Sequence, residues 1–381
     1  MLSAGMVGTA HAQPTALASW QWSDQGLPGG ASVVERVGTV SIANGSSAPE
    51  RPYAFVRASD GNLWVNWWSG SAWSWTNQGA PPGGVAGGVG AVGVKDTPSS
   101  AARPYAFVRG GDGNLWANWW TGSSWSWSNQ GAPAGGAADG IGVLTVKDTS
   151  NSSERPYAFV RGGDGNLWLN WWSGSSWAWS NQGTPSGGIS LGVGVTKVRN
   201  NSASSERPYA FVRGGDGNLW INWWTGSSWS WSNQGAPGGG IAGGVGATGV
   251  RNSPSSADRP YAFVRGGDGN LWLNWWSGSS WAWSNEGAPG GGVAGGVGAV
   301  SVQDSPSAGH RPYAFVRGGD GNLWVRWWSG SSWAWANQGA AAGGVADGIG
   351  VTTVKNTSSA SQRPYAFVKT HAGRLAVNWW G

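Results

Sequence analysis

The chain consists of short apolar runs separated by turn-forming residues, and the order of these runs repeats. The segment RPYAFV begins at residues 51, 103, 155, 207, 259, 311 and 363, so every interval is 52 residues. Each interval predicts four short strands, which in the second unit span 88–94, 103–109, 114–120 and 125–131. Four strands per unit without a helical period predict an all-β fold, a β-propeller with four antiparallel strands per blade.

The bulk of the side chains differs between the strands of a unit. The first strand is nearly all Gly, Ala and Val, whereas the third and fourth carry the tryptophans. Blades converge at the axis of a propeller and splay at the rim, so inner strands lack room for large side chains. We therefore expect the Gly-rich strand innermost and the Trp-rich strands outermost.

The two ends of the chain complement each other. An isolated outer-strand pattern, Trp20-Gln21-Trp22, opens the repeats, and the chain ends at Asn378-Trp379-Trp380, one outer strand short. We expect the N-terminal strand to complete the last blade, which closes the ring and removes a sheet edge. The sequence thus predicts one domain of seven blades over residues 18–381.

Residues 1–17 are predicted to be a remnant signal-like or disordered leader. They begin MLSAGMVGTAHAQ, and Ala10-His11-Ala12 is similar to a signal-peptidase site although no basic region precedes it. The leader favours a secreted or extracellular protein.

Composition and charge exclude several classes of function. The chain has no Cys, so it has no disulfide and no thiolate metal site, and no apolar run is long enough for membrane insertion. The formal net charge is +5, but the arginines occupy repeat positions and form no basic run, which argues against nucleic acid.

No constellation typical of an enzyme is present. A hydrolase needs a unique arrangement such as two carboxylates flanking the scissile bond, whereas these acidic residues repeat in turns or scatter through variable loops. His11, His310 and His371 share no repeat position with a Ser and an Asp. We expect no enzymatic activity and no cofactor.

The segment DGN recurs between the second and third predicted strands, for example at Asp112-Gly113-Asn114. An EF-hand type of calcium loop needs several alternating oxygen ligands, and DGN has one carboxylate. Asp-Gly is itself a two-residue hairpin signal. The segment therefore predicts a turn and no metal site.

The third strand combines an apolar face with a mixed one. In residues 167–172, Leu167, Leu169 and Trp171 share a face that we assign to the core, and Trp168, Asn170 and Trp172 share the other. Flat indoles beside a few fixed donors and acceptors suit a sugar, whose C–H face lies on a ring. Wedge packing is the alternative role of each tryptophan.

The candidate ligand-binding residues are those of this mixed face together with the Arg at the end of each YAFVR. They are Arg57, Trp64, Asn66, Trp68, Arg109, Trp116, Asn118, Trp120, Arg161, Trp168, Asn170, Trp172, Arg213, Trp220, Asn222, Trp224, Arg265, Trp272, Asn274, Trp276, Arg317, Trp324 and Trp328.

The last two repeats depart from this pattern. Arg326 replaces the amide in the sixth, and Ala376 replaces the first Trp in the seventh, where His371 and Arg374 also change the turn. We expect five intact sites, an altered one at Arg326 and a weak or inactive one at Ala376.

The unit YAFVRGGDGNLWLNWWSGSSWAWSNQG, residues 157–183, resembles the repeat of PLL-like bacterial lectins over residues 18–381. The resemblance implies a seven-bladed propeller that binds fucose and O-methylated sugars between adjacent blades. The residues alone leave the pocket at the rim, on a face or between blades.

Two functions follow from these patterns. The first is a multivalent lectin whose partners are fucosylated or O-methylated glycans on cell surfaces or glycoconjugates. The second is a protein-interaction or structural propeller without sugar binding, and a quinoprotein-like enzyme is a distant third. Near-identical repeats favour the first, because a scaffold varies its exposed residues to suit an asymmetric partner.

Overall fold

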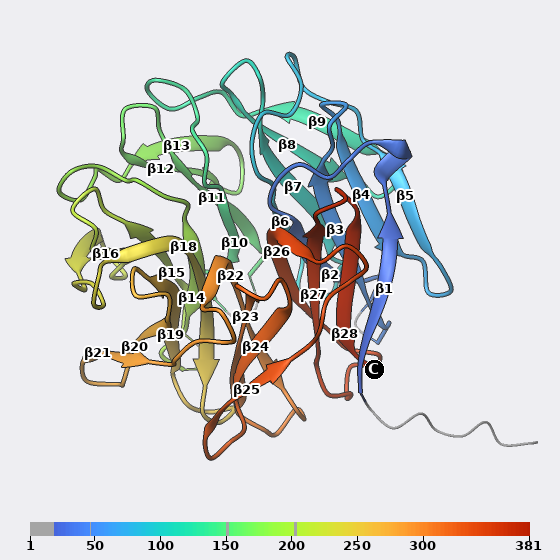
Figure 1. Ribbon diagram of the computed structural model, residues 1–381. Coiled ribbons are helices and arrows are strands. Elements are labelled where there is room, and N and C mark those ends of the chain that lie inside the picture. Colours follow the sequence, from blue (N-terminus) through green and yellow to red (C-terminus); the bar gives the residue numbers. More distant parts are fainter. Residues whose placement is uncertain (1–18, 46, 150–151, 202–203) are drawn as a thin grey trace, which may run out of the picture.

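The computed structural model describes residues 19–381 except 46, 150–151 and 202–203. It shows seven four-stranded antiparallel sheets arranged as the blades of a ring (Figure 1). The predicted all-β, seven-bladed propeller is therefore confirmed, while the predicted leader at 1–17 lies outside the described residues. In the described part of the chain the one helical segment is the 3-10 turn η1 (Pro28–Gly30), and no helix is long and apolar enough to cross a membrane.

We number the blades in chain order, and each runs from its innermost to its outermost strand. Blade 1 contains β2 (Gly38–Ala43), β3 (Glu50–Arg57), β4 (Leu63–Trp68) and β5 (Trp73–Asn77). Blade 2 contains β6 (Gly90–Val94), β7 (Arg103–Arg109), β8 (Leu115–Trp120) and β9 (Trp125–Asn129). Blade 3 contains β10 (Gly142–Val146), β11 (Arg155–Arg161), β12 (Leu167–Trp172) and β13 (Trp177–Asn181).

The remaining blades repeat this order. Blade 4 contains β14 (Gly194–Val198), β15 (Arg207–Arg213), β16 (Leu219–Trp224) and β17 (Trp229–Asn233). Blade 5 contains β18 (Ile241–Arg251), β19 (Asp258–Gly266), β20 (Leu271–Trp276) and β21 (Trp281–Asn285). Blade 6 contains β22 (Val293–Gln303), β23 (His310–Gly318), β24 (Leu323–Trp328) and β25 (Trp333–Asn337). Blade 7 contains β26 (Val345–Val354), β27 (Arg363–Thr370), β28 (Leu375–Trp380) and, outermost, β1 (Trp20–Gly26).

The Gly-rich strands lie innermost, as their lack of bulk predicts. Neighbouring first strands, such as β10 and β14, contact each other around the axis. A Cβ added at Gly142 would lie 2.6 Å from Cγ1 of Val195 and 2.9 Å from the carbonyl oxygen of Val193. Glycine is needed there because backbones of adjacent blades approach closely.

The aromatic residues pack between blades. Phe107 is fully buried in blade 2, and Trp177 of blade 3 packs edge-on against it at 5.8 Å. The indole Nε1 of Trp179 donates a hydrogen bond of 2.6 Å to the backbone oxygen of Gln130 in the preceding blade. Equivalent bonds link Trp231 to Gln182 and Trp283 to Gln234. Part of the tryptophan content is therefore wedge packing that joins the blades.

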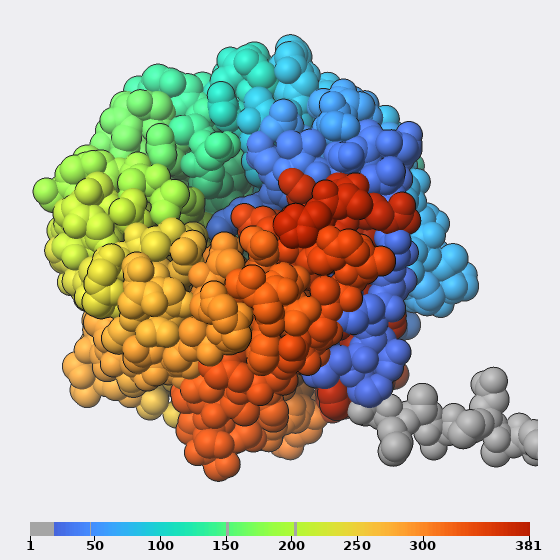
Figure 2. Space-filling model, viewed as in Figure 1, coloured from blue at the N-terminus to red at the C-terminus, as the bar shows by residue number. Residues whose placement is uncertain are grey.

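The N-terminal strand closes the ring as predicted. β1 pairs with β28, with Trp22 opposite Asn378, and Figure 2 shows this N-terminal segment in blue beside the red last blade. Nε1 of Trp22 donates to the backbone oxygen of Gln338 at 2.6 Å, which reproduces the indole bond of the other blades. An ion pair of 2.8 Å joins Asp24 to Arg374.

Candidate functional site

One face of each sheet packs against the preceding blade and the other face against the following blade. Cavities lie at several of these junctions between blades. Cavities of about 500, 730, 570 and 510 Å³ lie between blades 2 and 3, 3 and 4, 5 and 6, and 6 and 7. We call them the 2/3, 3/4, 5/6 and 6/7 cavities. All four are lined by the sheet ends at which the RPY segments begin, so they lie toward the same side of the ring.

The 3/4 cavity has an aromatic wall on each side. Tyr157 and Trp171 of blade 3 face Trp224 and Trp229 of blade 4. Each pair is formed by residues opposite each other on adjacent antiparallel strands. The ring centroids are 5.8 Å apart in the first pair and 5.7 Å apart in the second. Cross-strand pairing thus fixes two apolar walls.

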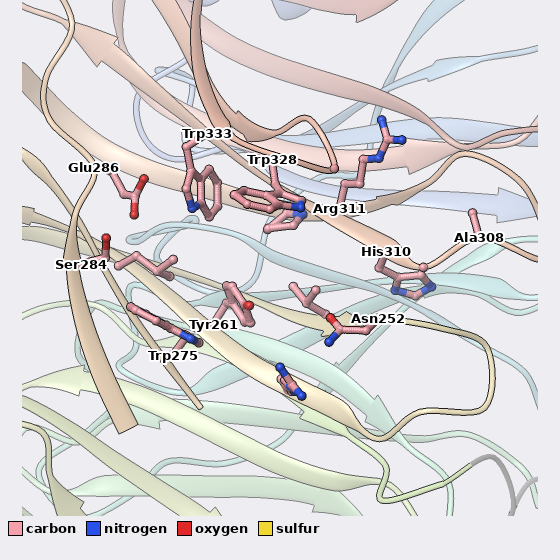
Figure 3. A pocket seen from close by; sticks show the side chains of 16 residues that line it. Asn252, Tyr261, Trp275, Ser284, Glu286, Ala308, His310, Arg311, Trp328 and Trp333 are labelled. Carbon is pink, nitrogen blue, oxygen red and sulfur yellow. The ribbon is translucent and has the colours of Figure 1, made fainter. Parts of the chain in front are cut away.

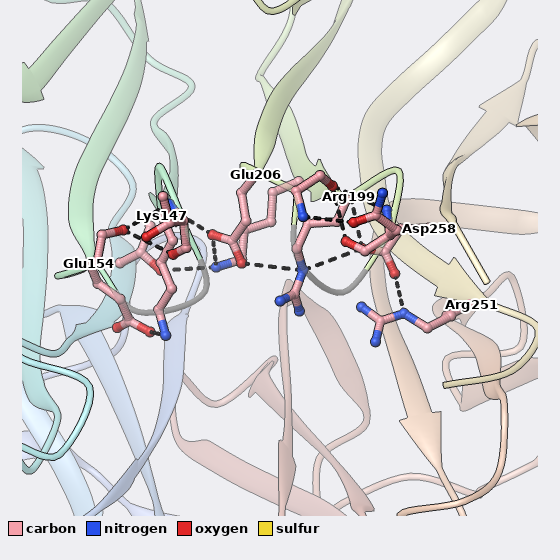
Figure 4. A network of polar contacts seen from close by, with 12 residues as sticks. Lys147, Glu154, Arg199, Glu206, Arg251 and Asp258 are labelled. Atoms are coloured by element: carbon pink, nitrogen blue, oxygen red, sulfur yellow. Dashed lines mark hydrogen bonds and ion pairs between the residues drawn. The ribbon is translucent and has the colours of Figure 1, made fainter. Parts of the chain in front are cut away.

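Charged groups surround the rim of the 3/4 cavity. Arg155 forms an ion pair with Asp148, and Glu206 enters from blade 4. Oε2 of Glu206 accepts hydrogen bonds of 2.9 Å from the backbone N–H of Lys147 and from Nζ of Lys197 (Figure 4). These bonds hold a buried carboxylate in one orientation.

The same clasp recurs around the ring. At five junctions, an acid or amide just before RPY accepts from a backbone N–H of the preceding blade, whose carbonyl accepts in return. The pairs are Glu50 with Lys355, Glu154 with Lys95, Glu206 with Lys147, Asp258 with Arg199 and Gln362 with Gln303. These reciprocal hydrogen bonds therefore fix the position of each blade relative to the preceding one beside the cavities.

The tyrosines of the cavity walls stay protonated over the neutral range. Burial raises the pKa of the Tyr157 phenol. Burial, together with Asp304, raises the pKa of Tyr313 to about 12. Each phenol can therefore both donate and accept a hydrogen bond. A cavity of this kind offers apolar rings, a guanidinium, a carboxylate and a hydroxyl to a small polar ligand.

One position of each predicted triple lines a cavity. Trp172 lines the 2/3 cavity, Trp224 the 3/4 cavity and Trp328 the 5/6 cavity. The equivalent residues Trp68, Trp120 and Trp276 pair with Trp73, Trp125 and Trp281 on the neighbouring strand, as Trp224 does with Trp229.

The predicted amides lie inside the blades. The side chains of Asn66, Asn118, Asn170, Asn222 and Asn274 are at most 1% exposed. Nδ2 of Asn170 donates across the strands to the backbone oxygen of Ala178 at 3.5 Å. The Oδ1 atoms of all five have no hydrogen-bond partner among the described residues.

The first indole of each triple is held by the DGN turn. Nε1 of Trp168 donates to the Asp164 carboxylate at 3.1 Å, and the ring packs edge-on against Trp179. The same bond forms in the other blades that keep this Trp, at Trp64, Trp116, Trp220, Trp272 and Trp324. None of these indoles lines any of the four cavities. Ala376, which replaces the indole in blade 7, does not line them either.

The predicted arginines lie at the opposite end of the sheets. Arg57 forms an ion pair of 2.6 Å with Glu35, and Nη1 of Arg213 donates to Oγ of Ser190 at 2.9 Å. Arg109, Arg161, Arg265 and Arg317 occupy the same strand ends in the other blades. Lys369, their equivalent in blade 7, lines an axial cavity that also contains Arg36 and Asp139. The structure does not bring these arginines together with the tryptophans that line the inter-blade cavities.

Each cavity is also lined by residues outside the predicted set. Trp171, assigned to the core, lines the 3/4 cavity, and Trp119, Trp275 and Trp327 line the other three. Trp171 also packs against the core, so it serves both purposes. The feature of the sequence that could have identified these residues is that every repeat has both RPY and, on the next strand, a Trp-Trp pair whose first Trp lies opposite the Tyr.

The DGN turns are complete without further ligands. The backbone N–H and Nδ2 of Asn114 and Nε1 of Trp116 all donate to the Asp112 carboxylate, at 2.9–3.1 Å for the shortest contact of each. Partial burial opposes ionisation, but these bonds outweigh it and hold the pKa of Asp112 below its ordinary value. Gly113 has φ of 79°, as the turn requires. Among the described residues, no group of three or more acidic or His side chains could hold a metal ion.

Solved structures with the same fold include several lectins. The BP39L lectin from Burkholderia pseudomallei matches 91% of this chain and 98% of its own, at 19% identity and a TM-score of 0.66. AofleA from Arthrobotrys oligospora matches 84% and 90% at 12% identity and a TM-score of 0.54. The Aleuria aurantia lectin, described as a six-bladed propeller with a novel fucose recognition mode, matches 82% and 99% at 17% identity and a TM-score of 0.52.

At these identities the likeness is one of fold. No protein-family model matches the chain, and no curated protein matches it in sequence. The fungal lectin with six blades covers less of this seven-bladed chain than BP39L does, as a missing blade would require.

Proposed function

We propose that the protein is a multivalent lectin that binds fucose or an O-methylated sugar in the cavities between its blades. The observation that carries the proposal is the repeated cavity with two aromatic walls and a fixed Arg–carboxylate rim, seen most fully between blades 3 and 4. The lectins of the same fold support it. The enzyme alternative has no comparable support, because the charged groups of the cavities are already engaged in structural contacts.

The chemistry of the 3/4 cavity suits a deoxy or methylated sugar. Trp171 and Trp224 offer apolar surfaces to a ring face and to a methyl group, which gain by leaving water. Arg155 donates to ring hydroxyls, and Glu206 accepts from them. In this arrangement Trp168 and Asn170 stabilise the blade rather than contact the sugar.

Repetition of the cavity makes the binding multivalent. Single monosaccharide sites of this kind have Kd values on the order of 10⁻⁵ to 10⁻³ M, and several sites on one side of a ring gain by avidity on a dense glycan. Such glycans lie on cell surfaces, so we place the protein outside the cell.

Crystals soaked with L-fucose test the proposal directly. We expect sugar against Trp171 and Trp224 in the 3/4 cavity. In solution, Trp224→Ala should weaken binding at this cavity by at least about tenfold, because it removes an aromatic wall. The matched control is Trp220→Ala on the same strand, which lies outside the cavity and should leave the sugar in place.

Three results would count against the proposal. A folded protein that binds no fucosylated or O-methylated glycan on an array would favour the scaffold function. Sugar seated beside Trp168 and Asn170 would move the site to the face predicted from the sequence. A stoichiometry of one sugar per chain would contradict multivalency.

A further inference from the structure

The four cavities share their aromatic walls but differ in the charges at their rims. Two repeat positions account for the difference: the second residue after the last Val of the first strand, and the residue just before RPY. The 2/3 cavity has Asp96 and Glu154 at these positions, and the 3/4 cavity has Asp148 and Glu206. The 6/7 cavity has Asp304 and Gln362. The 5/6 cavity has Asn252 and His310, so both carboxylates are replaced there.

The first replacement leaves a guanidinium without a counter-ion. In blades 2, 3 and 6, the Arg of RPY forms an ion pair with the Asp at this position: Arg103 with Asp96 at 2.9 Å, Arg155 with Asp148, and Arg311 with Asp304 at 2.8 Å. The guanidinium of Arg259, which has Asn252 as its neighbour, makes no hydrogen bond or ion pair within the described part of the chain.

The guanidinium of Arg259 also lies differently from that of Arg155. A Cβ added at Gly278 would lie 3.4 Å from Nη2 of Arg259, so the head group lies against the turn of its own blade. A Cβ added at the equivalent Gly174 of blade 3 would meet nothing within 4 Å. Arg155 is held by Asp148, whereas Arg259 has Asn252 at that position and can turn toward a ligand.

The second replacement adds no negative charge. His310 is half-buried, and Nδ1 is 3.4 Å from Oγ of Ser301. Burial, assisted by Arg251, lowers the pKa of His310, so the imidazole is neutral at pH 7. Asp258, the residue before RPY in blade 5, forms an ion pair of 2.6 Å with Arg251.

One carboxylate does line the 5/6 cavity, but its charge is balanced. Oε2 of Glu286 forms an ion pair with Arg326 at 3.0 Å, and Oε1 is buried without a partner among the described residues. In Figure 3, Glu286 lies at one side of the cavity, while His310 and Arg311 lie at the other. The cavity thus has guanidinium groups at one end and, at the other, a carboxylate that Arg326 neutralises.

We propose that the 5/6 cavity is a distinct subsite for a sugar that carries a carboxylate or sulfate group, with Arg259 as the counter-ion of that group. A guanidinium binds either anion through paired N–H donors. The 2/3 and 3/4 cavities disfavour such a ligand, because the Arg of RPY in blades 2 and 3 is already paired with an Asp. The inference rests on the proposed lectin function, since it assigns one of the same cavities a different ligand.

Titration calorimetry with monosaccharides tests this assignment. The ligands are methyl β-D-glucuronide, galactose 6-sulfate and the neutral methyl β-D-glucoside. We expect both anionic sugars to bind roughly 10- to 100-fold more tightly than the glucoside, as for a hydrogen bond to a charged group. The preference should decrease as salt is added. Crystals soaked with the glucuronide should show it in the 5/6 cavity.

Two variants and a control locate the effect. Asn252→Asp, in an exposed loop, gives Arg259 the partner that Arg155 has and should remove the preference for anionic sugars. The double variant Asn252→Asp/His310→Glu reproduces the rim of the 3/4 cavity and should do the same. Asn200→Asp adds the same charge beside Arg207 in blade 4 and should leave the preference unchanged.

The outcomes separate this inference from the proposed function. Binding of L-fucose in the 3/4 cavity without any preference for anionic sugars would overturn the subsite alone. An anionic preference that persists in Asn252→Asp, or a glucuronide found in the 2/3 or 3/4 cavity, would also overturn it. Absence of binding for every sugar, neutral or anionic, would overturn the lectin function itself.

Discussion

Replacing Glu286 by Gln should destabilise the protein, and the further substitution Arg326→Asn should restore its stability. Glu286 of blade 5 stands where the other blades have Gln, and Arg326 of blade 6 stands where they have Asn. The two departures face each other: Oε2 of Glu286 lies 3.1 Å from Nε and 3.0 Å from Nη2 of Arg326. They form one buried ion pair in a ring that otherwise uses amides.

The structure sets the size of the effect. The Glu286 side chain is 1% exposed and that of Arg326 15%. Removing one partner of a buried pair costs about 3–5 kcal/mol, and we expect about 3 kcal/mol because Arg326 keeps some solvent and its stacking on Trp333 and Trp335. An unfolding entropy of about 2.1 cal/mol/K per residue over 381 residues converts this loss into a melting temperature about 4 °C lower.

Thermal and urea unfolding of three variants at pH 7 measure the coupling. Glu286→Gln and Arg326→Asn should each be destabilised, and the double variant should lie within about 1 kcal/mol of the parent because it restores the amides of the other blades. As a matched control, Gln182→Glu buries an unpaired carboxylate in blade 3 and should be destabilising. Additive single effects, with a coupling below about 0.5 kcal/mol, would refute the reasoning.

Three further predictions concern closure, metal and pH. Deleting residues 1–30 removes β1 and its bond from Trp22 to Gln338, so the melting temperature should fall, and an unchanged value would exclude closure by this strand. EDTA should not affect sugar binding, because the DGN turns supply their own donors, whereas loss of binding that calcium reverses would contradict this. NMR titration should give His310 a pKa below its ordinary value of 6.5, since burial and Arg251 disfavour the cation. The unfolded chain then takes up the proton first, so stability should fall as the pH drops below about 6.5, and this loss should be smaller in His310→Gln.

The period and the bulk of the side chains were sufficient to predict the fold. RPYAFV at constant spacing defined the blades, and the contrast between Gly-rich and Trp-rich strands gave their radial order. The unpaired Trp20–Trp22 strand predicted closure of the ring, which the pairing of β1 with β28 confirms. These features depend on local sequence and on the geometry of a wedge, and both can be read from one chain.

The site was harder to predict because a propeller blade buries both faces. Alternation along β12 correctly separates Trp171 from Trp172, but it cannot tell which face is core when each meets another blade. Trp171 lines the 3/4 cavity and Trp172 the 2/3 cavity, so each cavity is built from opposite faces of two sheets. The contribution of Arg155 and Tyr157 from the adjacent strand could be recognised only once the junction was known.

Repetition makes each departure from the repeat informative, and three of them gather at one junction. Glu286, His310 and Arg326 all lie between blades 5 and 6. His310 stands where five other junctions have an acid or amide clasp, and the Glu286–Arg326 pair supplies a buried contact at the same junction. Since Glu286 also lines the cavity, stability and ligand choice can be tested separately at this junction. The double variant Glu286→Gln/Arg326→Asn should unfold like the parent yet bind sugar differently in the 5/6 cavity, because an amide replaces an acceptor-only oxygen.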